Sequence, residues 1–208
     1  MENKQELFEK APVWKAYFII SLPVVFSMLV TLIYNMVDTF FVSGTQNADL
    51  VAGVSQCTPL FMLMLALGDI FGLGGSSIIS RLFGQKDDAT AKNVSGFCFY
   101  AAIISGLIVT GLMFLFQTPI LKMLGATDAT VKYASQYYFF IAWGAALIIL
   151  SLTPSNIIRT EGLALQSMIA SVAGSIVNIA LDPLFIFTFK MGAGGAALAT
   201  VMGYVLSD

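Results

Sequence analysis

A carboxylate lies inside a long apolar stretch of this sequence, where an ionisable group is costly. The stretch runs from about residue 163 to 189 and contains Asn178, Asp182 and Pro183. A charge at membrane depth costs about 2.5–3.5 kcal/mol on insertion scales, so such a side chain usually faces a protein interior or a watery cavity. The position of Asp182 therefore predicts a functional group rather than a structural one.

The residue types around Asp182 suit the binding of a small cation or a proton. Asn178 precedes it by four residues, which places both side chains on one helical face. Pro183 has no backbone N–H and loosens the adjacent turn, so a carbonyl oxygen is freed. Amide, carboxylate and carbonyl oxygens are the ligands of small hard cations. Because the chain has no histidine, any proton relay must use carboxylates.

The elements that would carry these residues are membrane-spanning helices. The chain is 58% hydrophobic and only 11% charged, and its long apolar runs are typical of a polytopic membrane protein. We predict an all-α membrane protein of six helices, at about residues 15–42, 50–82, 94–116, 131–158, 163–189 and 194–208. The sixth run is shorter than the about 20 residues that a span needs. We therefore expect a truncated sixth helix and a longer parent protein.

The distribution of basic residues predicts the orientation. We expect residues 1–14 to be a cytoplasmic N-terminus with a short interfacial helix over 4–14, and residues 15–208 to form the six-helix lobe. Cytoplasmic segments of membrane proteins carry an excess of Lys and Arg. With the N-terminus inside, seven basic residues lie inside (Lys4, Lys10, Lys15, Arg81, Lys86, Lys92, Arg159) and three outside (Lys122, Lys132, Lys190). The formal charge of −2 offers no basic surface for nucleic acid.

Polar residues from three predicted helices reach a similar depth in this topology. At the rise of an α-helix, Asp38, Asp182 and Thr200 lie about 8 Å, about 12 Å and about 9 Å from the outer ends of their helices. Asn35 and Asn178 extend the same layer inward. The agreement in depth predicts one shared cavity in the outer half of the bilayer. For Asp38 a second interpretation stays open, in which its carboxylate simply reaches the water at the membrane surface.

Other polar residues have less definite interpretations. Asp69 falls in the middle of the second helix and either pairs within the bundle or marks a misplaced helix boundary. Tyr137 and Tyr138 are candidates for lining a cavity, although packing and interfacial tyrosines are commoner. Asn156 and Arg159 read as structural, with a cavity-facing amide as the alternative. The sequence contains no phosphate-binding loop, zinc spacing or catalytic triad, so we expect neither an enzyme nor an organic cofactor.

Four motifs of the chain resemble one transporter family. They are Pro23 with the run Tyr-Asn-Met-Val-Asp at 34–38, Ile-Ser-Arg-Leu-Phe-Gly at 79–84, Asn178-x3-Asp-Pro-Leu-Phe-Ile up to residue 186, and Gly-Ala-Gly-Gly-Ala-Ala-Leu-Ala-Thr at 192–200. On these motifs the chain resembles the N-terminal half of a MATE (multidrug and toxic compound extrusion) transporter, and the resemblance covers essentially all of it.

The resemblance implies a twelve-helix exporter in the bacterial cytoplasmic membrane, built from two six-helix lobes. It implies an antiporter that exports organic, often cationic, compounds and is driven by Na+ or H+. Its partners would be membrane lipid and the C-terminal lobe of the same protein. Carried onto matching positions, the cation site would consist of Asp38, Asn178, Asp182 and Thr200. Pro23 would bend the first helix, and the substrate cavity would involve Asn35, Tyr138 and Asn156.

Two departures from the family pattern and two alternative functions remain. The second lobe is absent, and the segment after Arg159 is less charged than the family's usual inner loop, which leaves the boundary of the fifth helix open. An exporter of lipid-linked oligosaccharides is one alternative, although only Arg81 and Arg159 would line its cleft. A six-helix channel or membrane scaffold is the other. No filter-like loop of carbonyls separates the fifth and sixth helices, which argues against the channel.

Overall fold

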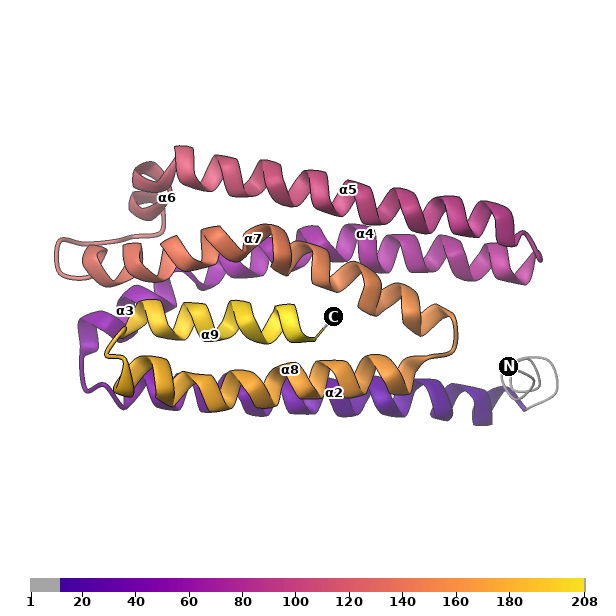
Figure 1. The fold of residues 1–208 in the computed structure, drawn as a ribbon, viewed down its shortest axis with the longest axis horizontal. Helices are drawn as coiled ribbons and strands as arrows, with labels where there is room; N and C mark the ends of the chain where they lie inside the picture. The colour runs from indigo at the N-terminus through magenta and orange to yellow at the C-terminus, as the bar shows by residue number, and fades with distance from the viewer. Residues whose placement is uncertain (1–11, 208) are drawn as a thin grey trace.

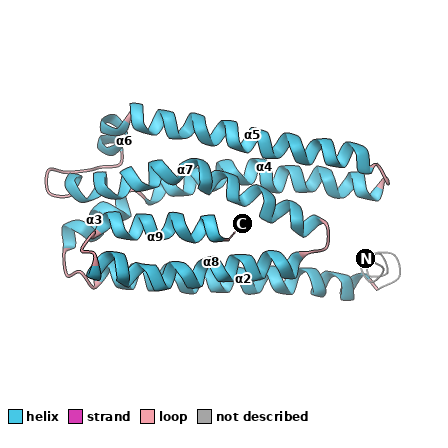
Figure 2. Ribbon diagram, viewed as in Figure 1, coloured by secondary structure: helices cyan, strands magenta, loops and turns pink. Residues whose placement is uncertain are grey.

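The described part of the chain is an all-helical bundle. The computed structural model describes residues 12–207, apart from the side chain of Ala16, and every regular element in this range is a helix (Figures 1 and 2). The predicted interfacial helix at 4–14 lies almost entirely outside the described residues. In chain order the helices are α2 (Val13–Ser43), α3 (Ala48–Gln56), α4 (Thr58–Gly84), α5 (Asp88–Leu115), α6 (Gln117–Met123), α7 (Val131–Thr160), α8 (Ala164–Pro183), the π-helical turn η1 (Leu184–Thr188) and α9 (Ala193–Leu206).

The apolar helices confirm the predicted fold class of an integral membrane protein. Within the described residues, five helical segments are long and apolar enough to cross a membrane. They are α2, α3 with α4, α5, α7, and α8 with η1. The sixth helix, α9, is apolar but has only 14 residues. Large apolar side chains cover the outside of the bundle, as expected where lipid replaces water.

The second predicted helix is divided in the structure, which corrects its expected continuity. Helix α3 ends at Gln56, and α4 begins at Thr58 after a turn residue, Cys57. Pro59 occupies the first turn of α4, where its missing N–H would be unpaired in any case. In a continuous helix the same proline would remove a hydrogen bond and clash with the preceding turn. The chain therefore starts a new helix at this point.

The connections contain features that hydrophobicity did not reveal. Helix α5 begins at Asp88, earlier than predicted, because the side chain of Asp87 accepts a hydrogen bond from the Thr90 amide at 3.0 Å and caps the helix. The short helix α6 was not predicted. It lies between α5 and α7 at the same end of the bundle as α3 (Figure 1).

Helix α7 is the centre of the bundle. It packs against α4, α5 and α9, whereas α2 packs along α8 (Figure 1). Fully buried apolar residues on α7 include Ile141, Ile148 and Ile149. Helices α8 and α9 pack against each other, so α9 links the α2–α8 pair to the α4–α5–α7 layer. This arrangement brings residues from both ends of the sequence to one interior.

Glycines set the closest helix contacts. A Cβ atom on Gly68 would lie 2.8 Å from the Ile149 carbonyl oxygen, and one on Gly72 would lie 2.8 Å from the Leu152 carbonyl oxygen. These distances are shorter than normal van der Waals contact, so only glycine allows α4 to approach α7 this closely. A Cβ on Gly74, on the same helix, would meet nothing within 4 Å.

These contacts make a prediction for stability. Replacing Gly68 with Val should destabilise the protein by about 1–3 kcal/mol, because the added side chain would separate α4 from α7. The measurement is the thermal midpoint of the detergent-solubilised protein, followed by size-exclusion chromatography. Gly74→Val is the matched control and should leave the midpoint nearly unchanged. Equal losses in both variants would contradict the packing described here.

Candidate cation and substrate site

The carboxylate of Asp182 is fully buried without a hydrogen-bond donor. It lies in the last turn of α8, and both of its oxygens lack a partner among the described residues. Asn178, one turn earlier, is 2% exposed, and its amide nitrogen and oxygen are also unpartnered. Buried polar groups are normally hydrogen-bonded, and a buried charge is normally paired. Two such groups on one face of α8 therefore form a site that needs a ligand.

Helix α2 brings a second carboxylate to the same place. Asp38 is half-buried, its Oδ1 atom lacks a partner within the described residues, and its charge acts repulsively on Asp182. Like charges inside a low-dielectric bundle disfavour the doubly ionised state. A bound proton or cation would relieve this repulsion. The two carboxylates are thus close enough for their charges to interact.

Close packing of α9 on α8 brings Thr200 to the same cavity as Asn178. A Cβ atom on Gly203 would lie 3.0 Å from the Cβ of Asn178, so the helices touch through this glycine. Thr200, one turn before it, is buried, and its hydroxyl donates to the Ala196 carbonyl at 3.0 Å. Because the hydroxyl proton is used in that bond, the oxygen lone pairs can face a cation.

The oxygen set fits a hard monovalent cation or a proton. No group of three or more His, Cys, Asp or Glu residues occurs in the described range. A metal ion at this place would therefore depend on the two carboxylates together with neutral amide and hydroxyl oxygens. Oxygen-only ligands suit Na+ rather than a transition metal. The local geometry of α8 also changes here, because a π-helical turn, η1, follows Pro183 directly, and such turns are frequent at functional sites.

Three tyrosines, Tyr34, Tyr137 and Tyr204, lie at this polar cluster, and of these only Tyr204 had no place in the sequence-based predictions. Tyr34 precedes Asp38 by one turn of α2 and interacts with its charge. Tyr137 on α7 is buried and lies close enough to Asp38 and Asp182 to interact with both charges. Tyr204 on α9 lies beside Tyr34. The spacing of four residues between Tyr34 and Asp38 is the one signal that sequence analysis could have used.

A cavity of about 580 Å³ opens next to this polar cluster. Asn178, Thr200 and Tyr34 line it, whereas Asp38 and Asp182 do not, so the carboxylates reach it only through their neighbours. Asn156 lines the cavity as predicted, and its Nδ2 donates to the Leu152 carbonyl at 2.8 Å. Asp69, whose role the sequence left open, also lines it.

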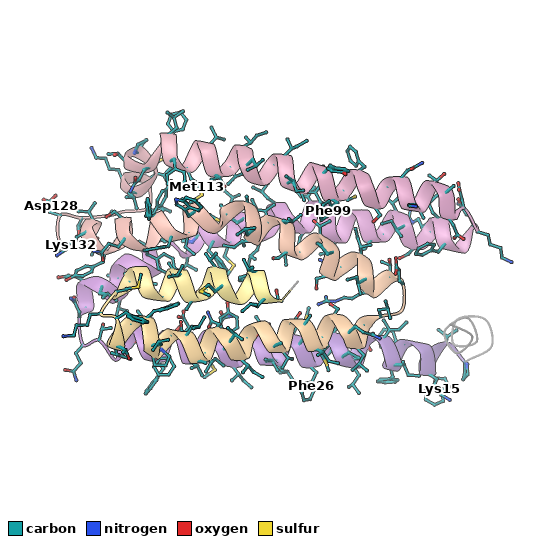
Figure 3. The ribbon with its side chains drawn as sticks, viewed as in Figure 1. Lys15, Phe26, Phe99, Met113, Asp128 and Lys132 are labelled. Carbon is teal, nitrogen blue, oxygen red and sulfur yellow. The ribbon has the colours of Figure 1, made fainter. Side chains whose placement is uncertain are left out.

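Two predicted cavity residues lie elsewhere. Tyr138 is completely buried, and its hydroxyl donates to the Met113 carbonyl at 2.6 Å, which fixes α7 to α5 (Figure 3 labels Met113). It does not line the cavity, so the expected cavity role is corrected to a packing role. Asn35 is exposed and is absent from the cavity lining. Its neighbour Tyr34 takes the inward position, because successive helical residues point about 100° apart.

The family model named MatE matches residues 23–184 of this sequence, more than half of the chain. The chain belongs to the MatE family. This membership confirms the resemblance that the motifs predicted. The multidrug export protein MepA of Staphylococcus aureus strain NCTC 8325 is 35% identical over 198 residues, which are 95% of this chain and 44% of MepA. The chain therefore spans less than half the length of that relative.

Solved structures show the same fold. A MOP superfamily transporter from Pyrococcus furiosus, described as having a binding pocket of reverse polarity, superposes with a TM-score of 0.91 at 33% identity. The match covers 98% of this chain and 45% of that transporter. A multidrug resistance MATE transporter in an outward-facing conformation gives a TM-score of 0.86 at 34% identity, over 91% of this chain and 42% of its own length. The described bundle is thus the N-lobe fold of the MatE family.

The placement of Tyr138 makes a prediction that separates packing from substrate contact. Tyr138→Phe removes a buried hydrogen bond and should lower stability by about 1 kcal/mol or somewhat more, since the Met113 carbonyl loses its donor. Thermal midpoints and a panel of exported dyes are measured in the full-length protein. Tyr100→Phe, at an exposed position on α5, serves as the control for both. A changed set of exported dyes in Tyr138→Phe, with an unchanged thermal midpoint, would contradict the packing role.

Proposed function

We propose that this chain is the N-terminal lobe of a cation-coupled antiporter that exports small organic, often cationic, compounds across the bacterial cytoplasmic membrane. Family membership and the name of MepA, a multidrug export protein, support the proposal. The decisive observation is the set of unpartnered oxygens of Asp182 and Asn178 next to the charge of Asp38. A buried site whose polar groups lack partners until an ion binds is what a transporter that exchanges an ion requires.

Coupling follows from the competing charge states of this site. With both carboxylates ionised, the repulsion between Asp38 and Asp182 favours an arrangement in which they separate or admit a cation. Binding of Na+ or H+ removes the repulsion and favours a closed arrangement. An ion can drive the change only through different affinities for the two states. By linkage, a compound in the adjacent cavity that prefers one state then weakens or strengthens ion binding by the same factor.

Helix α2 is the element proposed to move. It contains Pro23 within its 31 residues, which removes one backbone hydrogen bond of the helix. Hydroxyls on the following turns bind back to carbonyls: Ser27 donates to Val24 at 2.8 Å and Thr31 donates to Ser27 at 2.9 Å. Side-chain bonds of this kind often bend helices. Because Asp38 lies on the same helix, a bend near Pro23 is coupled to the ion site through α2.

The proposed orientation places the N-terminus in the cytoplasm. The α4–α5 and α7–α8 connections lie at the same end of the bundle as the start of α2 (Figure 1). Basic residues gather at that end (Lys15, Arg81, Lys86, Lys92, Arg159), with fewer at the other (Lys122, Lys132, Lys190). The excess favours the first end as cytoplasmic. The ion site near the α8–α9 connection then faces the outside, and a C-terminal lobe completes the transport cleft.

The alternative functions fit the cavity less well. A pocket for a lipid-linked oligosaccharide with its diphosphate would require several basic side chains. Arg159 is the one basic residue that lines the cavity among the described residues. A channel would conduct ions without exchange, so flux measurements in proteoliposomes separate it from an antiporter.

The first test removes one charge. In the full-length protein, Asp182→Asn should abolish ion-coupled efflux, because the site loses half of its carboxylate charge while keeping its shape. Efflux of a fluorescent cationic dye from cells is the measurement, with expression checked by immunoblot. Asp49→Asn, in the exposed first turn of α3, should transport normally. Undiminished efflux in the Asp182 variant would reject the assignment.

The second test identifies the coupling ion. Purified full-length protein is reconstituted into liposomes, and the Na+ and pH gradients are set independently. One inward ion gradient should drive dye movement in the opposite direction, and its collapse should stop transport. Dye movement that is insensitive to both gradients would contradict an antiport mechanism.

A further inference from the structure

The cavity carries one acidic and one basic side chain that the cation site does not use. Asp69 lines it from α4 and Arg159 from α7, and each side chain acts on the other through its charge. Arg159 is joined to Ser167 on α8, which lies eleven residues from Asn178 and therefore about 16 Å away along the helix. This charged region is thus separate from Asp182.

Contacts with a neighbouring helix restrain each of the two charges. The Nε atom of Arg159 donates to the Ser167 hydroxyl at 2.9 Å, and that hydroxyl also lies 2.9 Å from the Ser155 hydroxyl. Asp69 lies between Gly68 and Gly72, the two glycines that press α4 against α7. The backbone beside Asp69 therefore cannot shift without breaking this contact.

The two charges nevertheless do not form a contact ion pair. No nitrogen–oxygen distance between Asp69 and Arg159 falls within 4.0 Å, and the terminal nitrogens of Arg159 donate no hydrogen bond to the described residues. A guanidinium keeps two parallel N–H groups that match a carboxylate. Asp69 also interacts with the side chain of Asn156, and a carboxylate keeps further acceptor positions beyond one such contact. The two charges attract each other without forming a contact ion pair. Each side chain therefore keeps hydrogen-bonding positions for a ligand.

We propose that Asp69 and Arg159 form a two-charge subsite for amphoteric organic compounds, with the ligand's anionic group on Arg159 and its cationic group near Asp69. The proposal rests on the proposed export function and specifies its substrate class. A cavity of about 580 Å³ lies within the range of about 300–1,000 Å³ that small-molecule sites occupy. A ligand with both charges satisfies both side chains at once, whereas a simple cation gains only the contact with Asp69 and meets repulsion from Arg159.

The test compares two dyes that differ in one charge. Rhodamine B carries a cationic xanthene and a free carboxylate, and its ethyl ester keeps only the cation. Binding of each dye to the purified full-length transporter is measured by fluorescence polarisation, which requires no ion gradient. Full-length protein is used because Ser207, near the end of the chain, also lines the cavity.

The affinities of the two dyes should respond differently to the substitutions. Arg159→Gln should weaken rhodamine B about tenfold, the loss of one charge-assisted contact, and leave the ester unchanged or bound more tightly. Arg159→Lys should keep most of the preference for rhodamine B. Asp69→Asn should weaken both dyes, because both carry the cation. Two exposed positions at the far end of the bundle serve as controls: Asp128→Asn on the α6–α7 connection and Lys132→Gln in the first turn of α7 should change neither affinity (Figure 3).

Two outcomes would overturn the subsite. Equal effects of Arg159→Gln on both dyes would show that Arg159 does not contact the carboxylate. Unchanged affinities in both Asp69→Asn and Arg159→Gln, with intact size-exclusion profiles, would show that the pair is only structural. Binding is measured without transport, so the result does not depend on ion coupling. A failure of ion coupling in the wild-type protein would reject only the proposed export function.

Discussion

The fully buried and unpartnered carboxylate of Asp182, with the charge of the half-buried Asp38 beside it, is the constraint on which this structure depends. An uncompensated charge in a low-dielectric interior is strongly destabilising. Asp182 is fully buried and unpartnered in the described bundle, and Asp38 adds a like charge beside it. We propose that a proton or cation binds there for part of the time and relieves this cost. On this proposal the same feature that costs stability makes the protein responsive to ions.

The architecture around the two carboxylates combines closely packed helices with helix α2, which packs mainly against one neighbour. Glycines hold α4 to α7 and α9 to α8, so the walls that carry Asp69, Arg159 and Thr200 are fixed. Helix α2 differs in its packing, because it contacts mainly α8, and it contains Pro23. In the proposed mechanism a change of charge at Asp38 acts on this less constrained helix. The adjacent cavity lies against this element, which links ion binding to the space that would hold a compound.

The sequence predicted the helices better than the directions in which individual side chains point. Asp182 was evident because a carboxylate interrupts an apolar span. The division at Cys57 is not evident from hydrophobicity, because Pro59 lies within a long apolar run. Tyr137 and Tyr138 show the deeper difficulty: adjacent tyrosines point to different neighbours, one to the carboxylates and one to Met113. Where lipid-facing and buried faces are both apolar, hydrophobicity does not distinguish them.

The most direct test of the central claim is to count ions released when a compound binds. Purified full-length protein is mixed with a cationic dye in weakly buffered solution, while a pH indicator reports protons and radioactive sodium reports Na+. Dye binding should displace about one proton or sodium ion from the carboxylate pair, because the two ligands favour different states. Dye binding that releases neither ion in wild-type protein would contradict the central claim.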